Sequence, residues 1–439
     1  MKKIKRTLSV VTLAALITVL GACANHDDHD QASPTPEETE VQEEVDVEEG
    51  HDHGHAHGHA DETEHGGHHH GDTLTAPTNF NDKAAENLLH FNTKNITRLP
   101  SDDPLELSIM TSQMIWPATH EENQPGTVIL APLESWQLSL ASLNLVHHPN
   151  DGPLFYTENG AIPDRVITEI NRLQPKGNVA GTQVMVMGTI NYGELDKLAD
   201  FKIDQTTETE AAAFANEIDQ IYAELTHGTP NGVIISSMDE EAKLHSIPAG
   251  SWISHMSEPV LYVTHSELPQ ETIEALERRN GNAEIYVLGS EDIISQEVVK
   301  QLEEYGTVTT ISGDTPVELS IEFAKFKDRT TNFGWGVNQP GHGLMIASTA
   351  SPELAILAAP FAHLGKHAPM VWLEEGEVTD EWYDFLTLLK PMFDVEPTEG
   401  PYNHAYLLGT TDVVSYQTQG IIDEKLEIIS AHGDHHAHH

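Results

Sequence analysis

Residues 343–373 read GLMIASTASPELAILAAPFAHLGKHAPMVWL. An apolar run at 343–348 is followed by a helix-length segment that begins near Pro352, and a second apolar run covers 368–373. Short apolar runs separated by a helix are typical of parallel strands, because the helix carries the chain back across the sheet. This stretch therefore predicts a strand–helix–strand unit built around a buried sheet.

The same pattern occurs at two earlier places in the 439-residue chain, which indicates an internal repeat. The counterparts of the first strand are TVILAP at 127–132 and GVIISS at 232–237. The counterparts of the second strand are GPLFYT at 152–157 and EPVLYVT at 258–264. The helix-length segments between these strands begin near Trp136 and Glu241.

Each repeat continues with an amphipathic helix and a third strand. The helices are PDRVITEINRL at 163–173, PQETIEALERR at 269–279 and TDEWYDFLTLL at 379–389. The third strands are QVMVMGTI at 183–190, AEIYVLGS at 283–290 and HAYLLGTT at 404–411. Their glycines Gly188, Gly289 and Gly409 occupy one equivalent place, where we expect the strand to turn towards a helix.

A fourth element opens each repeat, near Arg98, Phe201 and Thr310. The openings DPLELSI at 103–109 and TPVELSI at 315–321 are so similar that duplication is their best explanation. Alternating strands and amphipathic helices give a parallel sheet covered on both faces. We therefore predict an α/β fold of three tandem parallel-sheet units, which are expected at 95–198, 199–306 and 307–429.

The repeats resemble the type 2 cell-wall-binding repeat family of bacterial surface proteins. ASPELAILAAPFAHLGKHAPMVWL at 350–373 follows the family's helix and its Pro-led strand, and 133–157 follows them more loosely. The similar region, 95–429, is about three-quarters of the chain. The resemblance implies three repeats packed about a pseudo-threefold axis and binding to anionic polymers of the cell wall.

The opening motif and the charge both depart from the family pattern. Arg98 begins the motif, but Pro104-Leu105 replaces the later Arg-Tyr pair, and the third repeat has SGD at 312–314 without any Arg. The chain has 70 Asp+Glu against 22 Lys+Arg, a formal net charge of -48. This excess argues against nucleic acid as a partner, because binding phosphates needs a basic surface. Binding to an anionic wall polymer then requires another contribution, such as bridging divalent cations.

The chain begins with the features of an export signal. Lys2, Lys3, Lys5 and Arg6 precede an apolar stretch at 8–20, which is too short to span a bilayer comfortably. The stretch ends in LGAC at 20–23, which resembles a bacterial lipobox and contains the only cysteine of the chain. We predict that 1–23 is a lipoprotein signal peptide, that Cys23 is lipidated, and that the protein is anchored extracytoplasmically to the membrane of a Gram-positive bacterium.

Residues 24–75 are acidic and rich in histidine, with few apolar side chains, so we expect a disordered tether. A second histidine-rich segment forms the tail at 430–439. Neutral imidazole binds Zn²⁺, Ni²⁺ and Cu²⁺, and this binding weakens as pH falls through about 6 because protons compete for the same lone pairs. The predicted metal ligands of these two histidine tracts are His51, His53, His55, His57, His59, His65, His68, His69, His70, His432, His435, His436, His438 and His439.

The sequence contains no GxGxxG, Walker loop, GxSxG or HExxH motif, so we expect a protein that is not an enzyme. We interpret His147 and His148 as residues that end a helix. The remaining scattered histidines are interpreted as single core or surface side chains; they are His227, His245, His255, His265, His363, His367 and His404.

Together these features predict a membrane-anchored extracytoplasmic lipoprotein whose repeats associate with the cell envelope without catalysis. Its expected partners are the membrane, a cell-wall polymer and divalent metal ions. The alternative is a lipoprotein that captures, buffers or delivers zinc or a similar ion through its histidine tracts. Deleting 51–70 and 432–439 distinguishes the two, because only the alternative depends on the tracts.

Overall fold

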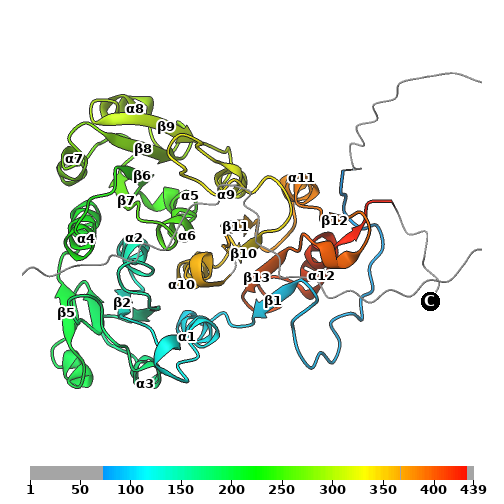
Figure 1. Ribbon diagram of the computed structural model, residues 1–439, viewed down its shortest axis with the longest axis horizontal. Coiled ribbons are helices and arrows are strands. Elements are labelled where there is room, and N and C mark those ends of the chain that lie inside the picture. The colour runs from blue at the N-terminus through cyan, green and yellow to red at the C-terminus, as the bar shows by residue number, and fades with distance from the viewer. Residues whose placement is uncertain (1–72, 366, 433–439) are drawn as a thin grey trace, which may run out of the picture. The chain divides into compact units, whose positions relative to one another are not determined.

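The computed structural model describes residues 73–365 and 367–432 (Figure 1). These residues belong to one compact unit. The predicted signal peptide at 1–23, the tether up to residue 72 and the tail from residue 433 lie outside the described residues. Within the described residues the chain alternates strands and helices, as the α/β prediction requires.

Three four-stranded sheets and one two-stranded sheet are formed by the described residues. The first sheet contains β2 (Val128–Pro132), β3 (Leu154–Thr157), β4 (Val184–Met187) and β5 (Ile203–Thr206). The second contains β6 (Gly232–Ser237), β7 (Val260–Val263), β8 (Ala283–Leu288) and β9 (Gly306–Ile311). The third contains β10 (Gly343–Ser348), β11 (Met370–Leu373), β13 (His404–Leu408) and β1 (Ile96–Leu99). The small sheet pairs β12 (Met392–Phe393) with β14 (Ile429–Ser430).

The three larger sheets have the same strand order, which is β3-β2-β4-β5, β7-β6-β8-β9 and β11-β10-β13-β1. Every strand pair in them is parallel. Every residue of the edge strands β3, β7 and β11 is buried, as expected for parallel sheets that are covered on both faces. The predicted parallel-sheet α/β architecture is therefore confirmed.

The fourth strand of each sheet comes from the opening element of another sequence repeat. β5 opens the second repeat but completes the first sheet, and β9 opens the third repeat but completes the second. β1 precedes the first sheet in the chain and completes the third, where Thr97 lies opposite Tyr406. The sheets therefore share strands across the repeats predicted from the sequence.

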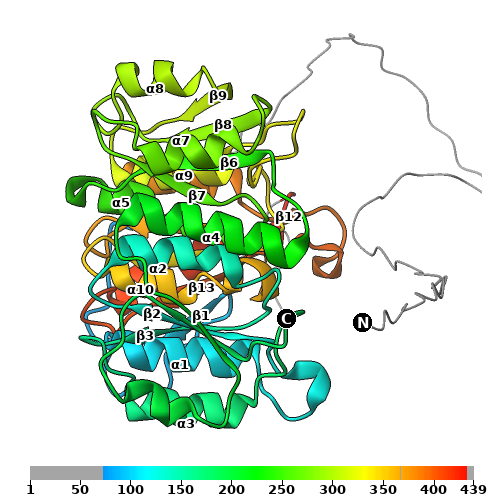
Figure 2. The same cartoon turned by 90° about the vertical axis from the view of Figure 1, so that its left-hand side faces the viewer.

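The helix that follows each of these strands packs on the next sheet. α1 (Pro104–Ile115) contacts β3, α4 (Ala211–Thr226) contacts β7, and α9 (Pro316–Lys325) contacts β11. Figure 2 shows α4 between the second sheet and α2, both of which it contacts. Each sheet is thus linked to the next by a strand and a helix, and β1 and α1 close the cycle between the third sheet and the first.

The similar openings of the first and third repeats form helix starts of the same kind. The Asp103 side chain accepts hydrogen bonds from the backbone of Leu105 and Glu106, and the Thr315 hydroxyl accepts one from Glu318. In both helices a proline follows the capping residue, where its missing N–H has no cost. The duplicated sequence therefore encodes a duplicated local structure.

Three short helical segments follow the first strands: α2 (Trp136–Ser142) with η2 (Leu143–Leu145), α6 (Ala249–Ile253), and α10 (Pro352–Ala358) with the π-helix η5 (Phe361–Gly365). α2 contacts both α6 and α10, and α6 contacts η2 and η5. The remaining helices are α3 (Asp164–Leu173), α5 (Lys243–Ser246), α7 (Gln270–Glu277), α8 (Gln296–Leu302), α11 (Asp380–Leu388) and α12 (Tyr416–Lys425). The short 3₁₀ turns are η1 (Glu121–Asn123), η3 (Glu194–Leu198), η4 (Glu240–Ala242) and η6 (Pro397–Glu399).

Candidate functional site

Of the residues that the sequence predicts as lipidation or metal sites, the structure describes only His432. Cys23, the tract histidines at 51–70 and the tail histidines from His435 onwards lie outside the described residues. His432 is described and exposed, and its backbone N–H donates to the Ser430 hydroxyl over 3.3 Å. The predicted lipidation and tract metal sites therefore stay predictions.

Five histidines from three distant parts of the sequence lie together where the three repeats meet. We call them the histidine cluster: His147, His148, His255, His363 and His367. In each repeat they fall in the segment between the central helix and the second strand. Since α2, η2, α6, α10 and η5 contact one another, the ends of these segments come together. Interpreting His255, His363 and His367 as single side chains was therefore wrong. His147 and His148, interpreted as residues that end a helix, also belong to this group.

The rings of the histidine cluster form a continuous chain of contacts. The His147 ring lies 3.7 Å from that of His148 and 3.3 Å from that of His363, centroid to centroid. The Nδ1 atoms of His255 and His363 are 3.0 Å apart, within hydrogen-bonding distance. The His255 and His367 rings are 4.2 Å apart. The buried Nδ1 of His147 has no hydrogen-bond partner.

Burial favours the neutral form of four of these rings, those of His147, His255, His363 and His367. Burial, followed by the neighbouring histidines His363, His148 and His255, lowers the pKa of His147 to about 3. Burial, followed by His367, His363 and Lys327, lowers the pKa of His255 to about 3. Burial also lowers the pKa values of His363 and His367. Their nitrogen lone pairs are therefore free of protons at neutral pH.

The backbone around the histidine cluster is irregular. His363 lies in the π-helix η5, a helix type found frequently at functional sites. His367 has φ 56° and Asp151, after the His147 turn, has φ 45°, in a region that non-glycine residues seldom occupy. The Asp151 carboxylate accepts a hydrogen bond from the Trp116 indole over 3.3 Å and partly offsets the lowering of the pKa of His363.

An aromatic wall adjoins the histidine cluster. The indole of Trp335 stacks on His255 with a centroid distance of 5.1 Å, and lies edge-on to His367 at 5.3 Å. Trp252, at the end of α6, lies 5.2 Å from Trp335. The indole nitrogen of Trp335 is buried without a hydrogen-bond partner, a cost that calls for an explanation.

Arg98, which begins the opening motif, is buried and connects β1 to the last part of the module. Arg98 is 4% exposed, and its guanidinium donates to the carbonyl oxygens of Gly409, Thr410 and Val414 over 2.8–2.9 Å. Its Nε donates to Gln419 over 2.7 Å. Burial lowers the pKa of Arg98 to about 10. This cation therefore fixes β1 to the third sheet and is not presented to a polymer.

Most other cations of the described residues are also occupied within the fold. The ion pairs are Lys94–Glu427, Arg165–Asp103, Arg172–Glu169, Lys197–Glu194, Arg278–Asp219, Arg279–Asp219, Lys325–Glu322 and Lys425–Glu424. Lys176, Lys202 and Lys327 donate to backbone carbonyls. Of the described Lys and Arg, those that lack such partners are Lys83, Lys243, Lys300, Arg329 and Lys390. They belong to separate segments of the chain.

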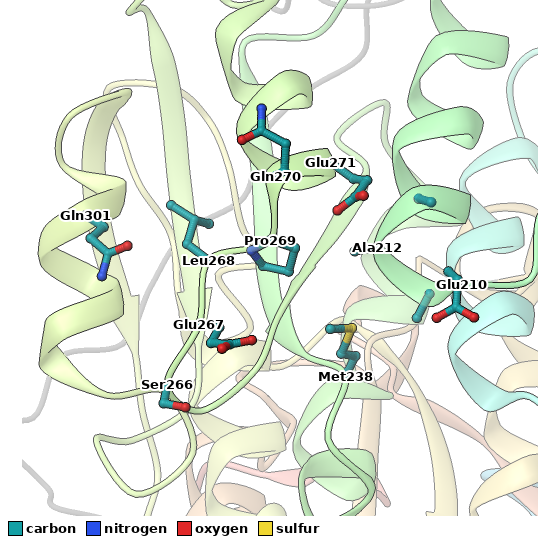
Figure 3. A pocket seen from close by; sticks show the side chains of 12 residues that line it. Glu210, Ala212, Met238, Ser266, Glu267, Leu268, Pro269, Gln270, Glu271 and Gln301 are labelled. Atoms are coloured by element: carbon teal, nitrogen blue, oxygen red, sulfur yellow. The ribbon is translucent and has the colours of Figure 1, made fainter.

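A cavity of about 610 Å³ lies at the carboxyl end of the second sheet, between the starts of α4 and α7. Figure 3 shows the carboxylates of Glu210, Glu267 and Glu271 around it, and no Lys or Arg is among its lining residues. Helix starts attract anions, but the three carboxylates oppose this attraction. The cavity is therefore unsuited to an anionic ligand.

The part of the chain that the structure describes has neither a membrane-spanning helix nor a preformed metal site. None of its helices combines the length and the apolar character needed to cross a bilayer. In the same residues no group of three or more His, Cys, Asp or Glu side chains is positioned, as it stands, to hold a metal ion. The histidine cluster is thus close-packed without a preformed coordination shell.

Solved structures with a similar fold are known. Cwp6 from Clostridium difficile matches 79% of this chain with a TM-score of 0.62 and 14% sequence identity. Cwp8 from Clostridium difficile matches 76% with a TM-score of 0.58 and 14% identity. The match covers 50% and 52% of those chains, so this chain spans about half their length. No protein-family model matches the sequence, and no curated protein matches it.

Proposed function

We propose that this chain is an extracytoplasmic lipoprotein whose repeat module associates with the bacterial cell wall without catalysing a reaction. The observation that carries the proposal is the fold, three parallel sheets of one strand order, similar over 79% of the chain to Cwp6. Cwp6 and Cwp8 are cell wall proteins of a Gram-positive bacterium. Association with the wall is the role that such a likeness favours.

The proposal includes a pseudo-threefold arrangement of the repeats. In support, each sheet receives its fourth strand from another repeat, and each opening helix packs on the next sheet. The central helical segments of the three repeats also contact one another. A module built in this way offers three related surfaces, and several weak contacts on one polymer can add up to firm retention.

The proposed association does not rely on direct electrostatic attraction between this protein and an anionic polymer. The formal net charge is -48, and most described cations are bound within the fold. Screening limits repulsion to about 8 Å at physiological salt, so contacts through hydrogen bonds remain feasible. Divalent cations shared between carboxylates of the protein and the polymer would add attraction. Wall association should then weaken when such ions are removed.

Removing the proposed anchor tests wall association in the cell. In a Cys23→Ser variant the lipid cannot be attached, so the membrane no longer retains the protein. We expect the variant to leave the membrane fraction and stay in the wall fraction, from which removal of the anionic wall polymers releases it. Since an unprocessed signal could itself hold the chain, a second variant carries an ordinary secretory signal in place of 1–23. Complete release of both variants into the medium contradicts the proposal.

Metal capture by the histidine tracts is the second proposed function. It is favoured by the density of histidines at 51–70 and 432–439, which can surround an ion with several nitrogens. If it is the main role, deleting both tracts slows growth on medium depleted by a chelator, and added zinc restores growth. Unchanged growth of the deletion strain rejects this role and leaves wall association untouched.

A further inference from the structure

We propose that the histidine cluster binds one divalent cation of the zinc type, at a site in the folded module that is separate from the histidine tracts. The ligands we assign are His255 and His363, completed by His147 or His367. This inference does not depend on the wall-associated role, because it concerns the junction of the repeats and not their outer surfaces. Each repeat contributes at least one of the four side chains.

The distance between the ring nitrogens of His255 and His363 suits two ligands of one metal ion. Zinc–nitrogen bonds of about 2.0–2.1 Å at tetrahedral angles place two ligand atoms about 3.3 Å apart. The Nδ1 atoms of His255 and His363 are 3.0 Å apart, close to that separation. A single ion between them would accept both lone pairs, whereas without it one ring must donate a proton to the other.

His147 and His367 lie close enough to His255 and His363 to provide a further ligand. His147 stacks on His363 at 3.3 Å, its buried Nδ1 has no partner, and His367 lies 4.2 Å from His255. No three donors converge among the described residues as they stand, so a third nitrogen must rotate into the shell. His147 and His367 lie in irregular segments after helices, where turning a ring disturbs no helical hydrogen bond.

The surrounding charges define the conditions for binding. Neutral imidazoles are required, because a ring nitrogen that carries a proton has no lone pair to give to the ion. Asp151, which acts electrostatically on His363, favours a cation. Lys327 opposes it, since it also lowers the pKa of His255, but its ammonium is held by the carbonyls of Asn332 and Gly334 over 2.7 and 2.9 Å.

Cobalt(II) titration of the full chain tests the site, provided that the histidine tracts can no longer bind metal. In the variant used, every histidine of 24–75 and 430–439 is replaced by Asn. We expect the visible absorption of nitrogen-coordinated cobalt to saturate at one equivalent per chain, and zinc to displace it. Absence of a saturable absorption change overturns the proposal.

Cluster substitutions then locate the ion. In the same background His255→Phe and His363→Phe, singly and together, should abolish the absorption while far-UV circular dichroism stays unchanged. His227→Asn is the matched control, because it removes a lone histidine at the end of α4 where φ of 60° suits Asn. Cobalt absorption that survives both cluster substitutions contradicts the assignment.

A second readout does not depend on the cluster variants folding. Trp335 stacks on His255, so cobalt bound there should quench its fluorescence. Trp335→Phe should therefore lose a large part of the cobalt-induced quenching and keep the cobalt absorption. Quenching that is the same with and without Trp335 would place the ion elsewhere and overturn the proposal.

Discussion

Arg98 begins the opening motif of the first repeat, and its side chain holds the closed fold together. Its guanidinium is buried and donates to three carbonyls and a glutamine of the third sheet's loops and α12. Because these acceptors come from residues more than 300 positions later, one side chain joins the two ends of the module. The sequence alone indicated its position in the motif, but these partners depend on the closure of the fold.

Replacing Arg98 by Met should therefore be strongly destabilising. The variant leaves several buried carbonyl oxygens without donors, so we expect a loss of about 3 kcal/mol or more in the free energy of unfolding. Urea denaturation measures it. Arg165→Met is the control, since its ion pair with Asp103 is exposed and should contribute less than about 1 kcal/mol. Equal effects of the two substitutions would contradict the anchoring role.

His245 provides a pH-dependent prediction outside the histidine cluster. Burial lowers the pKa of this histidine below its ordinary value of 6.5, so between that value and its lower folded pKa the unfolded chain binds a proton that the folded chain does not. The free energy of unfolding should therefore fall as pH is lowered from 7 to 5.5, by less than about 1 kcal/mol for this partly exposed ring. Comparing the wild type with His245→Gln by urea denaturation isolates the effect. An identical pH dependence of the two proteins would contradict it.

At the scale of elements, the glycines after the third strands were predicted correctly from the repeat. Gly188, Gly289 and Gly409 have φ of 81°, 138° and 98°, values that side-chain-bearing residues rarely adopt. The repeat revealed these positions because equivalent turns need the same backbone freedom in each copy.

Alanine substitution at two glycines should have opposite effects. Gly409→Ala forces a strained φ and brings its Cβ to 3.2 Å from Asp102 Oδ1, so we expect a loss of about 1–2 kcal/mol. Gly420→Ala, in α12, meets no atom within 4 Å and should stabilise the helix by up to about 1 kcal/mol. Thermal unfolding followed by circular dichroism measures both. Stabilisation by both substitutions would show that Gly409 is not under strain.

The positions of the strands and helices in the repeats were predictable to within a few residues. The sheet that each opening strand joins was not predictable. Apolar runs such as 343–348 indicate a strand by composition, and β10 has the same bounds. Nothing local in the openings at Arg98, Phe201 and Thr310 indicates that β1, β5 and β9 join another repeat's sheet. The histidine cluster was missed for the same reason, although one signal was available: each repeat has a histidine between its central helix and its second strand.

At the scale of the whole molecule, the cyclic sharing of strands predicts that the repeats unfold together. No sheet is complete without a strand from another repeat, and β1 ties the start of the module to its end. We expect urea unfolding followed by tryptophan fluorescence and by far-UV circular dichroism to give coincident single transitions. Trp136, Trp252 and Trp372 lie one in each repeat, so the fluorescence contains a contribution from all three. Separate transitions for the three repeats would contradict this coupling.

The excess of acidic residues opposes the proposed association with an anionic cell wall. A protein with formal net charge -48 is repelled by anionic polymers unless specific contacts or shared cations outweigh the repulsion. Wall retention should therefore decrease when a chelator removes divalent ions, and increase when they are restored. Pelleting in the presence and absence of the chelator measures this change, and a protein without affinity for the wall shows no dependence on it.

Association of the repeats with the cell wall is tested most directly by co-sedimentation of the mature chain with purified cell walls, with and without their anionic polymers. The variant with Asn in place of the tract histidines is measured beside the wild type, so that capture through metal ions is separated from binding by the repeats. We expect saturable pelleting of both proteins that disappears when the polymers are stripped. Absence of pelleting at every salt and divalent-ion concentration would contradict the claim that the three-sheet module associates with the wall.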